Sequence, residues 1–409
     1  MSKRVVVTGL GVVSPVGNDL ETFWKAQCAG RSGIGRIEHF DVSEHPTKIA
    51  GMAEDVAPKG MTSKDFRRRG RYALFALAAA DEAWAQSGID INRENPFRCG
   101  VTIGSGIGGL VSSEDDYMVF REKGPKRLSP LAVPKMLTNL AGGEVAIRLG
   151  LQGPNKAVVS ACATGAQSIG DAVSLIRQGV ADVMVTGGTE AAVTPFAVAG
   201  FCAMRALSRR NDEPERASRP FDRDRDGFVI GEGAGIMVLE SEEHAHARGA
   251  HIIAEVAGYG ETCDAHHITA PLPDGAGAVA AMRIATESAR ISPDQIAYFN
   301  AHGTSTAQND VAESRAVNTF FGEQSPPVSS TKSMIGHLLG AAGAVESVVT
   351  VLAIRDNVLP PSINYDHPDP ECPVNIVANE AREAPVAIAM SNSLGFGGHN
   401  TAIIFREYE

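Results

Sequence analysis

The feature that most constrains the fold is a regular alternation of short apolar runs with Ala-rich stretches. The apolar runs have the length and β-branched composition of buried strands, whereas Arg71–Gln86 and Gly165–Gln178 have the length and composition of helices. The strand-like runs in the first part of the chain are Arg4–Thr8, Cys99–Ile103, Ala157–Val159, Val183–Thr186 and Gly235–Leu239. This alternation predicts an α/β fold with buried sheets.

The alternation starts again after about residue 250. The second series consists of strand-like and helix-like segments at Ile252–Val256, Ala276–Arg290, Ile296–Asn300, Asp310–Asn318, Ala341–Arg355, Val386–Ser391 and Asn400–Phe405. We therefore predict two similar α/β halves, residues 1–250 and 251–409, although the identity between them is too weak to demonstrate a duplication. The loops between the elements are short enough for the halves to pack tightly.

Composition and charge exclude several classes of protein. With 409 residues, 44% of them hydrophobic, the chain can bury a large core. A net charge of -11 argues against a nucleic acid partner. The apolar runs stay below the roughly 18 residues that a membrane span needs, so we expect no membrane insertion. Because no signal or transit peptide precedes the first apolar run, we expect a cytoplasmic protein.

The run Gly104-Ser-Gly-Ile-Gly-Gly109 fits the G-x-G-x-x-G pattern of dinucleotide-binding loops. In such a protein the pattern lies in the first βα turn, a helix opens directly after it, and an acidic residue follows about 20 residues later. Here residues 111–122 are polar and we expect them to be irregular. A nicotinamide site is therefore not predicted.

Metal sites are also not predicted. The six cysteines lack Cys-x-x-Cys spacing, which argues against a zinc site or a disulfide framework. Asp222–Gly227 resembles the start of an EF-hand loop, but its twelfth position is Gly233 and a strand follows, so a salt-bridged, tight turn is the better interpretation. Residues 266–267 and the pair His244 and His246 are expected to be solvated surface histidines.

The segment around Cys162 has the form of a nucleophile elbow. Apolar residues lead into the small residues Ser160 and Ala161, and a helix is predicted to begin near the cysteine. At a helix N-terminus the free backbone N–H groups lower a thiol pKa and supply an oxyanion hole. A structural buried cysteine is the alternative for this segment taken alone.

Two further segments carry histidines. His302 follows the apolar run Ile296–Phe299, so it is expected at the carboxyl end of a strand, where active sites of α/β proteins gather. Lys332 and His337 lie in an otherwise uncharged stretch rich in Gly and Ala, where a buried charge is costly without a partner. A lone histidine in such a stretch would more often belong to the core.

A fourth segment, Ser391–Asn400, places Phe396 between glycines. Glycines on both sides of one aromatic residue favour a mobile lid or backbone donors beside a ligand. This segment, together with the cysteine and histidine segments, completes a set of candidate active-site motifs.

In their order and separation, these four segments resemble the β-ketoacyl-acyl-carrier-protein synthases of the thiolase superfamily. The similarity runs from about Arg4 to Phe405. The Cys-His-His set and the motif Gly200–Ser208 are most similar to the elongating synthase II type. The resemblance implies two duplicated thiolase-like halves that form a five-layered α-β-α-β-α core.

The resemblance also implies a reaction and its catalytic residues. An acyl group on Cys162 would condense with malonyl-acyl carrier protein, with loss of CO2, to give a 3-oxoacyl carrier protein in fatty acid elongation. The catalytic residues would be Cys162, His302, His337 and Lys332, with the backbone N–H groups of Cys162 and Phe396 as the oxyanion hole. His302 and His337 would hold the malonyl thioester and assist decarboxylation, while Lys332 would orient or electrostatically tune His337 and the thiolate.

Further roles follow from the resemblance. The substrate-binding positions would be Ile107, Phe201, Thr269, Thr304, Thr306 and Phe396. Asp310 and Glu346 would be structural acids. No cofactor is expected, since the substrates are carried on the phosphopantetheine arm of acyl carrier protein. No metal is required either, although some family members hold a monovalent cation at the positions of Asn300, Glu346, Ser391 and Asn392.

Because the carrier protein is acidic, a docking patch should be basic. The residues that match the docking regions of the family are Lys64, Arg67, Arg68, Lys126, Arg127 and Arg205, with Arg69 and Arg71 beside the first cluster. A homodimer is expected, with residues 111–127 reaching across to the partner. A carrier-binding scaffold is disfavoured because Cys162 and both histidines are present. Thiolase-type cleavage is disfavoured because the C-terminal Gly-rich segment lacks a second cysteine.

The chain departs from the family pattern at a few positions. Ala307-Gln308-Asn309 replaces a segment that usually contains Pro and Gly, which predicts a changed turn. Leu394 replaces a usual Phe, and His399 stands where Thr is common. A ketosynthase of a dissociated polyketide or polyene pathway remains the alternative function within the family.

Overall fold

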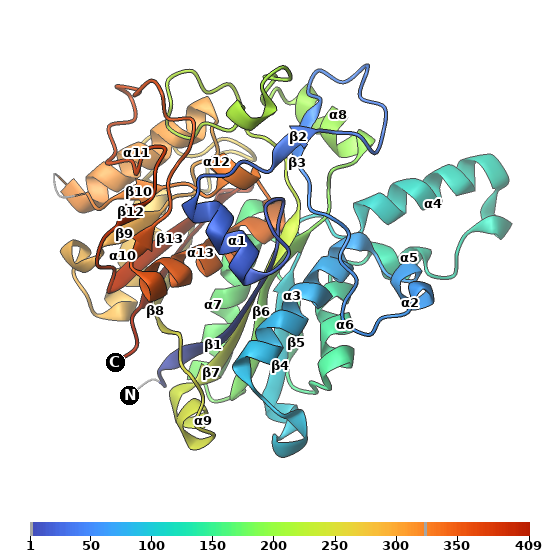
Figure 1. Cartoon of the computed structure of the whole chain (residues 1–409), viewed down its shortest axis with the longest axis horizontal. Coiled ribbons are helices and arrows are strands. Elements are labelled where there is room, and N and C mark those ends of the chain that lie inside the picture. Colours follow the sequence, from blue (N-terminus) through green and yellow to red (C-terminus); the bar gives the residue numbers. More distant parts are fainter. Residues whose placement is uncertain (1–2, 323–324) are drawn as a thin grey trace.

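A hydrogen-bonded sheet of ten strands runs through the molecule (Figure 1). The computed structural model describes residues 3–322 and 325–409. The first half of the chain contributes β1 (Val5–Val13), β4 (Cys99–Gly104), β5 (Asn155–Lys156), β6 (Val183–Glu190) and β7 (Gly233–Ser241). These strands lie in the order β5-β4-β6-β7-β1; β4 is parallel to β5 and β6, whereas β7 is antiparallel to β6 and β1.

The second half repeats this arrangement. It contributes β8 (Ala254–Cys263), β9 (Tyr298–Asn300), β10 (Val328–Ser329), β13 (Ile388–Gly395) and β14 (His399–Arg406). Their order is β10-β9-β13-β14-β8, with the same parallel and antiparallel pairs at equivalent places. In each half the strands, numbered along the chain, therefore follow the order third, second, fourth, fifth, first. The predicted duplication of α/β halves is confirmed at the level of topology.

Helices cover both sides of the two strand sets and fill the space between them. The outer helices are α3 (Arg71–Ser87) and α6 (Leu140–Leu149) on the first set, and α10 (Ala276–Ala289) with α11 (Ala307–Phe321) on the second. The central helices are α7 (Thr164–Arg177) and α13 (Ala342–Asp356), which contact each other and strands of both sets. Every residue from 342 to 354 is buried, as a central layer requires.

The five-layered α-β-α-β-α core is thus confirmed, with one addition. The two β layers are joined edge to edge because β1 and β8 pair at Val6 with Glu255 and Val7 with Ala254. Both layers therefore belong to one continuous sheet that folds around α7 and α13.

Shorter elements surround this core. They are α1 (Leu20–Cys28), β2 (Ile34–Arg36), β3 (Ile49–Gly51), α2 (Ser63–Arg67), α5 (Ala132–Met136), α8 (Pro195–Ala203), α9 (Glu242–Ala247), α12 (Lys332–Ile335), β11 (Val358–Leu359) and β12 (Arg382–Glu383). In the described parts of the chain, no helix is both long and apolar enough to cross a membrane.

Three local predictions differ from the structure in kind or in bounds. The segment expected to be irregular after Gly109 is a regular helix, α4 (Leu110–Lys123), which projects from the body beside α5 and α2 (Figure 1). All of its side chains are at least partly exposed, so the sequence carries no apolar period to reveal it. The strand expected at 157–159 is shorter and begins two residues earlier, since β5 contains only Asn155 and Lys156. The helix expected to begin at Asp310 begins at Ala307.

Candidate active site

Cys162 lies in a sharp turn at the amino end of the central helix α7. The turn is a short 3-10 segment, Ala161–Ala163, in which Ala161 has a φ of +51°. Non-glycine residues rarely adopt this left-handed conformation, and it directs the next side chain out of the turn. Gly395 packs so closely against the turn that a Cβ atom there would lie 2.6 Å from the Ser160 carbonyl oxygen. The predicted elbow is confirmed.

The pKa of the thiol differs from the prediction. Burial raises the pKa of Cys162 to about 11, and the charge of Lys332 and a hydrogen bond from the Phe396 backbone N–H oppose this rise only in part. The prediction of a lowered pKa is therefore wrong, because moving the thiolate out of water outweighs the nearby donors. The thiol is protonated at neutral pH and must lose its proton as it reacts. The Phe396 N–H faces the sulfur atom.

The imidazoles of His302 and His337 lie edge to face, with ring centroids 5.3 Å apart. Both side chains are buried. Burial lowers the pKa of each well below its usual range, and the positive charge of Lys332 adds to the effect. Both rings are therefore neutral at physiological pH.

Hydrogen bonds determine which nitrogen of each ring carries the proton. His337 Nδ1 accepts from the Leu339 backbone N–H at 3.2 Å, so its proton is on Nε2. Lys332 Nζ, which can only donate, lies 3.3 Å from His302 Nδ1, so this ring also carries its proton on Nε2. Buried His337 Nε2 lacks a hydrogen-bond partner among the described residues. The pair presents two N–H donors suited to a developing oxyanion.

Lys332 is almost fully buried and is held by two partners. Its ammonium group donates to the His302 carbonyl oxygen at 2.6 Å and pairs with the Glu346 carboxylate. Of the two predicted roles toward His337, the ammonium group does not orient that ring by a hydrogen bond, since its hydrogen bonds go to His302 and Glu346. The positive charge still acts on both imidazoles and on Cys162.

These groups open into one cavity of about 560 Å³. Cys162, His302, His337 and Phe396 line it, as do all the other predicted substrate-binding positions: Ile107, Phe201, Thr269, Thr304 and Thr306. Its wall is mainly apolar around Ile107 and Phe201, and hydroxyl groups line it at Thr304 and Thr306, whose oxygens are 2.9 Å apart. A chain that is apolar at one end and polar at the other fits such a cavity.

Comparisons with known proteins agree with this geometry. The models of the β-ketoacyl synthase N-terminal and C-terminal domains match residues 2–245 and 253–366. This chain belongs to the β-ketoacyl synthase family. The 3-oxoacyl-[acyl-carrier-protein] synthase 2 of Synechocystis is 49% identical over 100% of the chain and 99% of the relative, and that of Vibrio cholerae is 50% identical over 99% and 100%.

Solved structures of synthases have the same fold. A β-ketoacyl synthase from Burkholderia phymatum superposes with a TM-score of 0.93 at 38% identity, covering 100% of both chains. A type II polyketide ketosynthase in complex with its acyl-carrier protein superposes with a TM-score of 0.92 at 35% identity, again over 100% of both chains.

In this β-ketoacyl synthase, two buried acids of α11 hold the loop that carries His302. Asp310, a predicted structural acid, accepts from the backbone N–H groups of Thr304 and Ser305 at 3.0 and 3.1 Å. Glu313 accepts from the backbone N–H groups of His302 and Gly303, both at 2.7 Å. Sequence reasoning missed Glu313. A signal was present, since an acid three positions after Asp310 lies on the same face of a helix.

The departure at residues 307–309 lies at the start of a helix. Thr306 is the N-cap of α11, and its side chain accepts from the Asn309 backbone N–H. Ala307, Gln308 and Asn309 form the first turn of this capped helix. The Arg225 side chain stabilises the start of this helix by donating to the carbonyl oxygens of Thr306 and Ala307.

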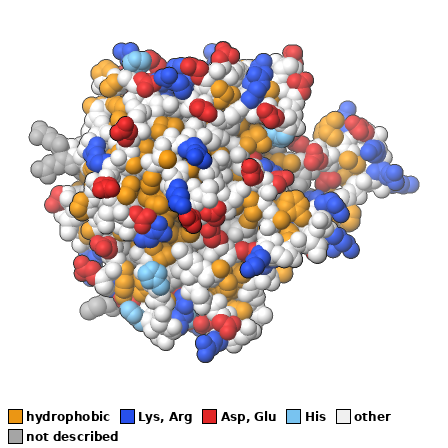
Figure 2. Space-filling model, in the orientation of Figure 1, with side chains coloured by type: hydrophobic (Ala, Val, Ile, Leu, Met, Phe, Trp, Pro, Cys, Tyr) orange, Lys and Arg blue, Asp and Glu red, His pale blue; other side chains and the backbone are white. Residues whose placement is uncertain are grey.

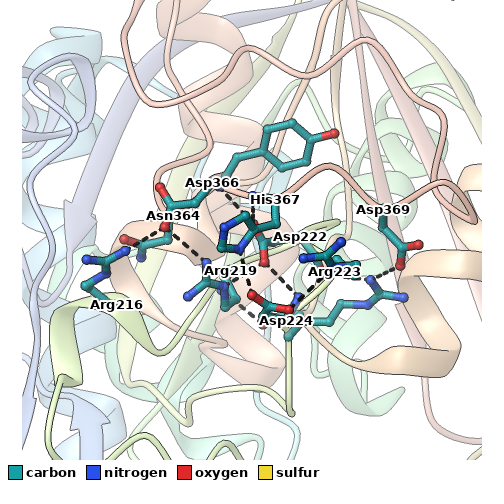
Figure 3. Close-up of polar contacts among 12 residues, drawn as sticks. Arg216, Arg219, Asp222, Arg223, Asp224, Asn364, Asp366, His367 and Asp369 are labelled. Atoms are coloured by element: carbon teal, nitrogen blue, oxygen red, sulfur yellow. Dashed lines mark hydrogen bonds and ion pairs between the residues drawn. The ribbon is translucent and has the colours of Figure 1, made fainter.

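Ion pairs and backbone hydrogen bonds hold the Asp222–Gly227 loop (Figure 3). Asp222 accepts from the Arg219 side chain and from the backbone N–H groups of Asp224 and His367. Asp222, Asp224 and His367 are close enough together to share a metal ion, but these N–H donors already engage the Asp222 oxygens. The prediction of a salt-bridged, tightly turned loop is confirmed.

The other histidines have structural partners. His244 lies between two carboxylates, with its Nδ1 2.6 Å from Glu240 and its Nε2 2.8 Å from Glu94. It is therefore part of a half-buried ion cluster, and the prediction of a solvated surface residue is wrong for it. His267 Nδ1 accepts from the Thr269 backbone N–H at 3.1 Å and so stabilises the turn that presents Thr269 to the cavity.

The residues predicted to surround a monovalent cation include a group of unpaired buried oxygens. Asn300 Oδ1, Glu346 Oε2, Ser391 Oγ and Asn392 Oδ1 are all buried and lack hydrogen-bond partners in the described parts of the chain. Asn300 and Ser391 are directly paired across β9 and β13. Oxygen atoms left without donors are costly in a protein interior, and a cation satisfies them. The donor set fits such an ion.

The basic residues in and beside the predicted docking regions differ in whether they form ion pairs. Arg69 pairs with Glu144 at 2.8 Å, and Arg71 pairs with Asp55 at 2.7 Å and with buried Glu232. These two arginines are part of the fold. The predicted docking residues themselves make no ion pair with any described residue; they are Lys64, Arg67, Arg68, Lys126, Arg127 and Arg205. Arg205 lines the cavity, and Figure 2 shows Lys and Arg side chains gathered at the projecting end of the molecule that α4 forms.

Proposed function

We propose that this chain catalyses the decarboxylative condensation of a Cys162-bound acyl group with malonyl-acyl carrier protein to give a 3-oxoacyl carrier protein in fatty acid elongation. The observation that carries the proposal is the presence, in one cavity, of the Cys162 thiol and two neutral imidazoles with Nε2–H donors. The match of about 49% to curated 3-oxoacyl-[acyl-carrier-protein] synthase 2 proteins supports it.

The first step transfers the acyl group. The Cys162 sulfur attacks the thioester carbon of the acyl carrier, the carbon-sulfur bond to the carrier breaks, and the thiol proton ends on the carrier sulfur. The backbone N–H groups of Cys162 and Phe396 stabilise the tetrahedral oxyanion, in agreement with the Phe396 N–H that faces the sulfur. This N–H also helps a thiol with a raised pKa to ionise during the attack.

The second step forms the carbon-carbon bond. The malonyl thioester oxygen accepts from Nε2–H of His302 and His337, the bond to the carboxylate breaks, and CO2 leaves. The resulting enolate carbon attacks the acyl carbonyl on Cys162, the carbon-sulfur bond breaks, and the released sulfur takes up a proton. Lys332 acts as a positioning residue, because it keeps His302 in the tautomer that donates.

We propose a monovalent cation bound by Asn300, Glu346, Ser391 and Asn392, and no other cofactor. Together with the ammonium group of Lys332, such an ion would neutralise the carboxylate of Glu346. It would also make the residues that support the histidines more rigid. Potassium or sodium should raise the thermal stability relative to choline at equal ionic strength. Equal stability in all three salts would contradict the site.

We propose that acyl carrier protein docks on the six unpaired basic residues described above. A ketosynthase of the same fold has been solved in complex with its acyl-carrier protein. An acidic partner is attracted by free Lys and Arg side chains more than by those already held in ion pairs. The Arg67→Glu, Arg68→Glu double variant should raise KM for carrier substrates, with a smaller change in kcat. An unchanged KM would contradict this docking surface.

We also propose a homodimer in the cytoplasm, formed at the β5 end of the sheet. Asn155 and Lys156 of this edge strand are exposed, whereas the opposite edge, β10, is covered by backbone hydrogen bonds with residues 375–377. Tyr117 and Met118 of α4 are each more than half exposed. An open strand edge beside apolar side chains favours pairing with a second copy. A monomer in sedimentation at micromolar concentration would contradict it.

A polyketide or polyene ketosynthase is the second candidate. A solved type II polyketide ketosynthase has the same fold at 35% identity, and the ishigamide ketosynthase/chain length factor has it at 36%. The higher identity to curated synthase 2 proteins favours fatty acid elongation.

Mass spectrometry of the intact protein tests the central claim. After incubation with a panel of acyl carriers, the wild-type chain should gain the mass of one acyl group, whereas Cys162→Ala should gain none. Digestion should locate the modification on Cys162. If the Cys162→Ala variant condensed acyl and malonyl carriers at the wild-type rate, the proposed function would be wrong.

A further inference from the structure

The glycine-rich run Gly104–Gly109 holds a carboxylate of the protein itself. Glu190, the last residue of β6, is fully buried. Its Oε2 accepts from the backbone N–H groups of Gly106 at 2.8 Å and Gly340 at 3.0 Å. Its Oε1 accepts from the Ser105 hydroxyl at 2.8 Å and from the Ile107 N–H at 3.3 Å. The loop that resembles a dinucleotide-binding pattern thus holds a buried carboxyl group of the protein in the place of a phosphate.

The hydroxyl group of Ser105 extends this arrangement by one residue. Its oxygen donates to Glu190 and accepts from the Gly108 backbone N–H at 2.9 Å. The amides of three consecutive residues, 106 to 108, are therefore fixed directly or through Ser105 by one carboxylate. A loop held in this way keeps one conformation, since a buried N–H group without an acceptor is costly.

This loop forms part of the wall around the nucleophile. Gly106 and Ile107 line the cavity together with Cys162, and so does Leu339, the neighbour of Gly340. Glu190 itself does not line the cavity; it reaches the substrate space only through the residues that it holds. Ile107 contributes an apolar side chain to this wall.

We propose that Glu190 is a positioning residue that fixes Ile107 against the acyl end of the cavity and thereby sets which acyl chains Cys162 accepts. This inference rests on the proposed function and adds a determinant of substrate specificity to it. A chain that must pass Ile107 meets a wall whose position depends on the Glu190 hydrogen bonds. The malonyl group, which is held at the imidazoles, does not depend on this wall.

Replacement by glutamine changes this arrangement in a defined way. Two backbone N–H groups converge on Oε2, so the amide oxygen of Glu190→Gln must take that place. The amide NH2 then faces Ser105, whose hydroxyl can turn to accept, and Ile107, whose N–H loses its acceptor. The variant therefore releases mainly the Ile107 amide.

The test compares acylation profiles. Acylation of Cys162 is followed by intact-protein mass spectrometry with short, medium and long straight-chain acyl carriers, and malonyl-carrier decarboxylation is measured in parallel. Glu190→Gln should change the ratio of kcat/KM between long and short chains by about three- to tenfold, as expected for one hydrogen bond. Decarboxylation should stay within about twofold, since no hydrogen bond at the imidazoles is lost.

Glu82→Gln is the matched control. Glu82 also accepts from two backbone N–H groups, those of Val12 and Leu20, but it lies outside the cavity. It should lower stability without changing the chain-length profile. A wild-type profile for Glu190→Gln, or an equal change in Glu82→Gln, would overturn the proposal.

A second variant covers the case in which Glu190→Gln does not fold. Ser105→Ala removes the bridge between the Gly108 N–H and the Glu190 carboxylate. It must then shift the chain-length profile in the direction predicted for Glu190→Gln. A wild-type profile would overturn the inference. If the wild-type Cys162 were not acylated by any carrier, the proposed function would fail and this inference with it. If the wild-type chain is acylated but the variants have the same chain-length profile as the wild type, only this inference fails and the proposed function stands.

Discussion

Two turns of the same construction lie at the amino ends of the two central helices. In the first half, Ala161–Ala163 precedes α7; in the second half, Leu339–Ala341 precedes α13. Both are short 3-10 segments whose first residue has a positive φ, +51° at Ala161 and +48° at Leu339. Each follows the outermost strand of its half, β5 or β10. The duplication of the fold therefore includes the elbow itself.

The two turns differ in what occupies the position after the positive φ. That residue is Cys162 in the first half and Gly340 in the second. The end of β13 brings the Phe396 N–H to the sulfur, whereas the end of β6 brings the Glu190 carboxylate to the Gly340 N–H. One elbow thus faces the substrate space, and the equivalent space at the other elbow holds the carboxyl group of Glu190.

This comparison indicates a division of labour between the halves. The first half supplies the residue that stores the acyl electrophile, Cys162. The second supplies the donors that prepare the nucleophile, His302 and His337, and the ammonium group of Lys332 that holds one of them. Because the nucleophile and the imidazoles lie in different halves, replacing the thiol or an imidazole should remove one partial reaction and leave the other.

The largest expected effect separates these tasks. His337→Ala removes an N–H donor to the enolate and should lower malonyl-carrier decarboxylation by about 100- to 1000-fold, the usual cost of one lost oxyanion donor. Cys162 should still become acylated. CO2 release and intact mass measure the two reactions on the same sample.

Cys162→Gln provides the opposite case for that experiment. It should retain decarboxylation and lose acylation and condensation, because the imidazoles remain while the nucleophile is gone. If His337→Ala decarboxylated at the wild-type rate, or if either folded variant lost both partial reactions together, the division between the halves would be wrong.

The second effect concerns the elbow without a thiol. A Cβ atom at Gly340 would lie 2.3 Å from the Gly106 backbone nitrogen and 2.8 Å from Glu190 Oε2, so Gly340→Ala must displace the loop. We expect a loss of about 1–3 kcal/mol in the free energy of unfolding, as for other overpacked sites. Urea denaturation measures this loss.

Gly143→Ala is the control for this substitution, since a Cβ atom there meets only Leu140 at 4.0 Å on a helix. It should be neutral or stabilising. A Gly340→Ala variant as stable as Gly143→Ala would show that the second elbow has room for a side chain, which would contradict its close packing on the loop.

The sequence predicts the parts of this comparison that depend on residue type and spacing. Cys162, His302 and His337 belong to motifs whose neighbours are close in the chain, and the structure places their side chains in one cavity. Glu190 was not predicted, because a carboxylate that accepts backbone N–H groups leaves no periodic pattern, whereas Glu313 had a signal only in its spacing from Asp310. The main partners of Glu190 are also far away in the chain.

Two features that the sequence did not reveal have the same physical origin. The side chain of Lys332 makes its hydrogen bond to the ring of His302, thirty positions earlier, and not to His337, its neighbour in sequence. Helix α4 was taken for irregular chain because its side chains are all at least partly exposed. Contacts between distant segments, and elements whose burial depends on other surfaces, are not encoded in local periodicity.

The smallest expected effect tests the connection between the halves. Helix α9 joins β7 to β8, and His244 in it lies between Glu240 and Glu94. Hydrogen bonds to these carboxylates raise the pKa of His244 from 6.5 to about 8. Because the folded pKa is raised, the stabilisation is fully present below about pH 6.5 and is lost as the pH rises through 8.

His244→Asn should therefore lose up to about 2 kcal/mol of the free energy of unfolding at pH 6 and much less at pH 9. Urea denaturation of wild type and variant across this range gives the difference, in which the titration of other groups cancels. His246→Asn, on the same helix but exposed, should show no such pH dependence. If the difference in the free energy of unfolding between wild type and His244→Asn stayed constant from pH 6 to 9, this histidine would contribute by packing and not by its charge. The connection between the two halves would then be insensitive to pH.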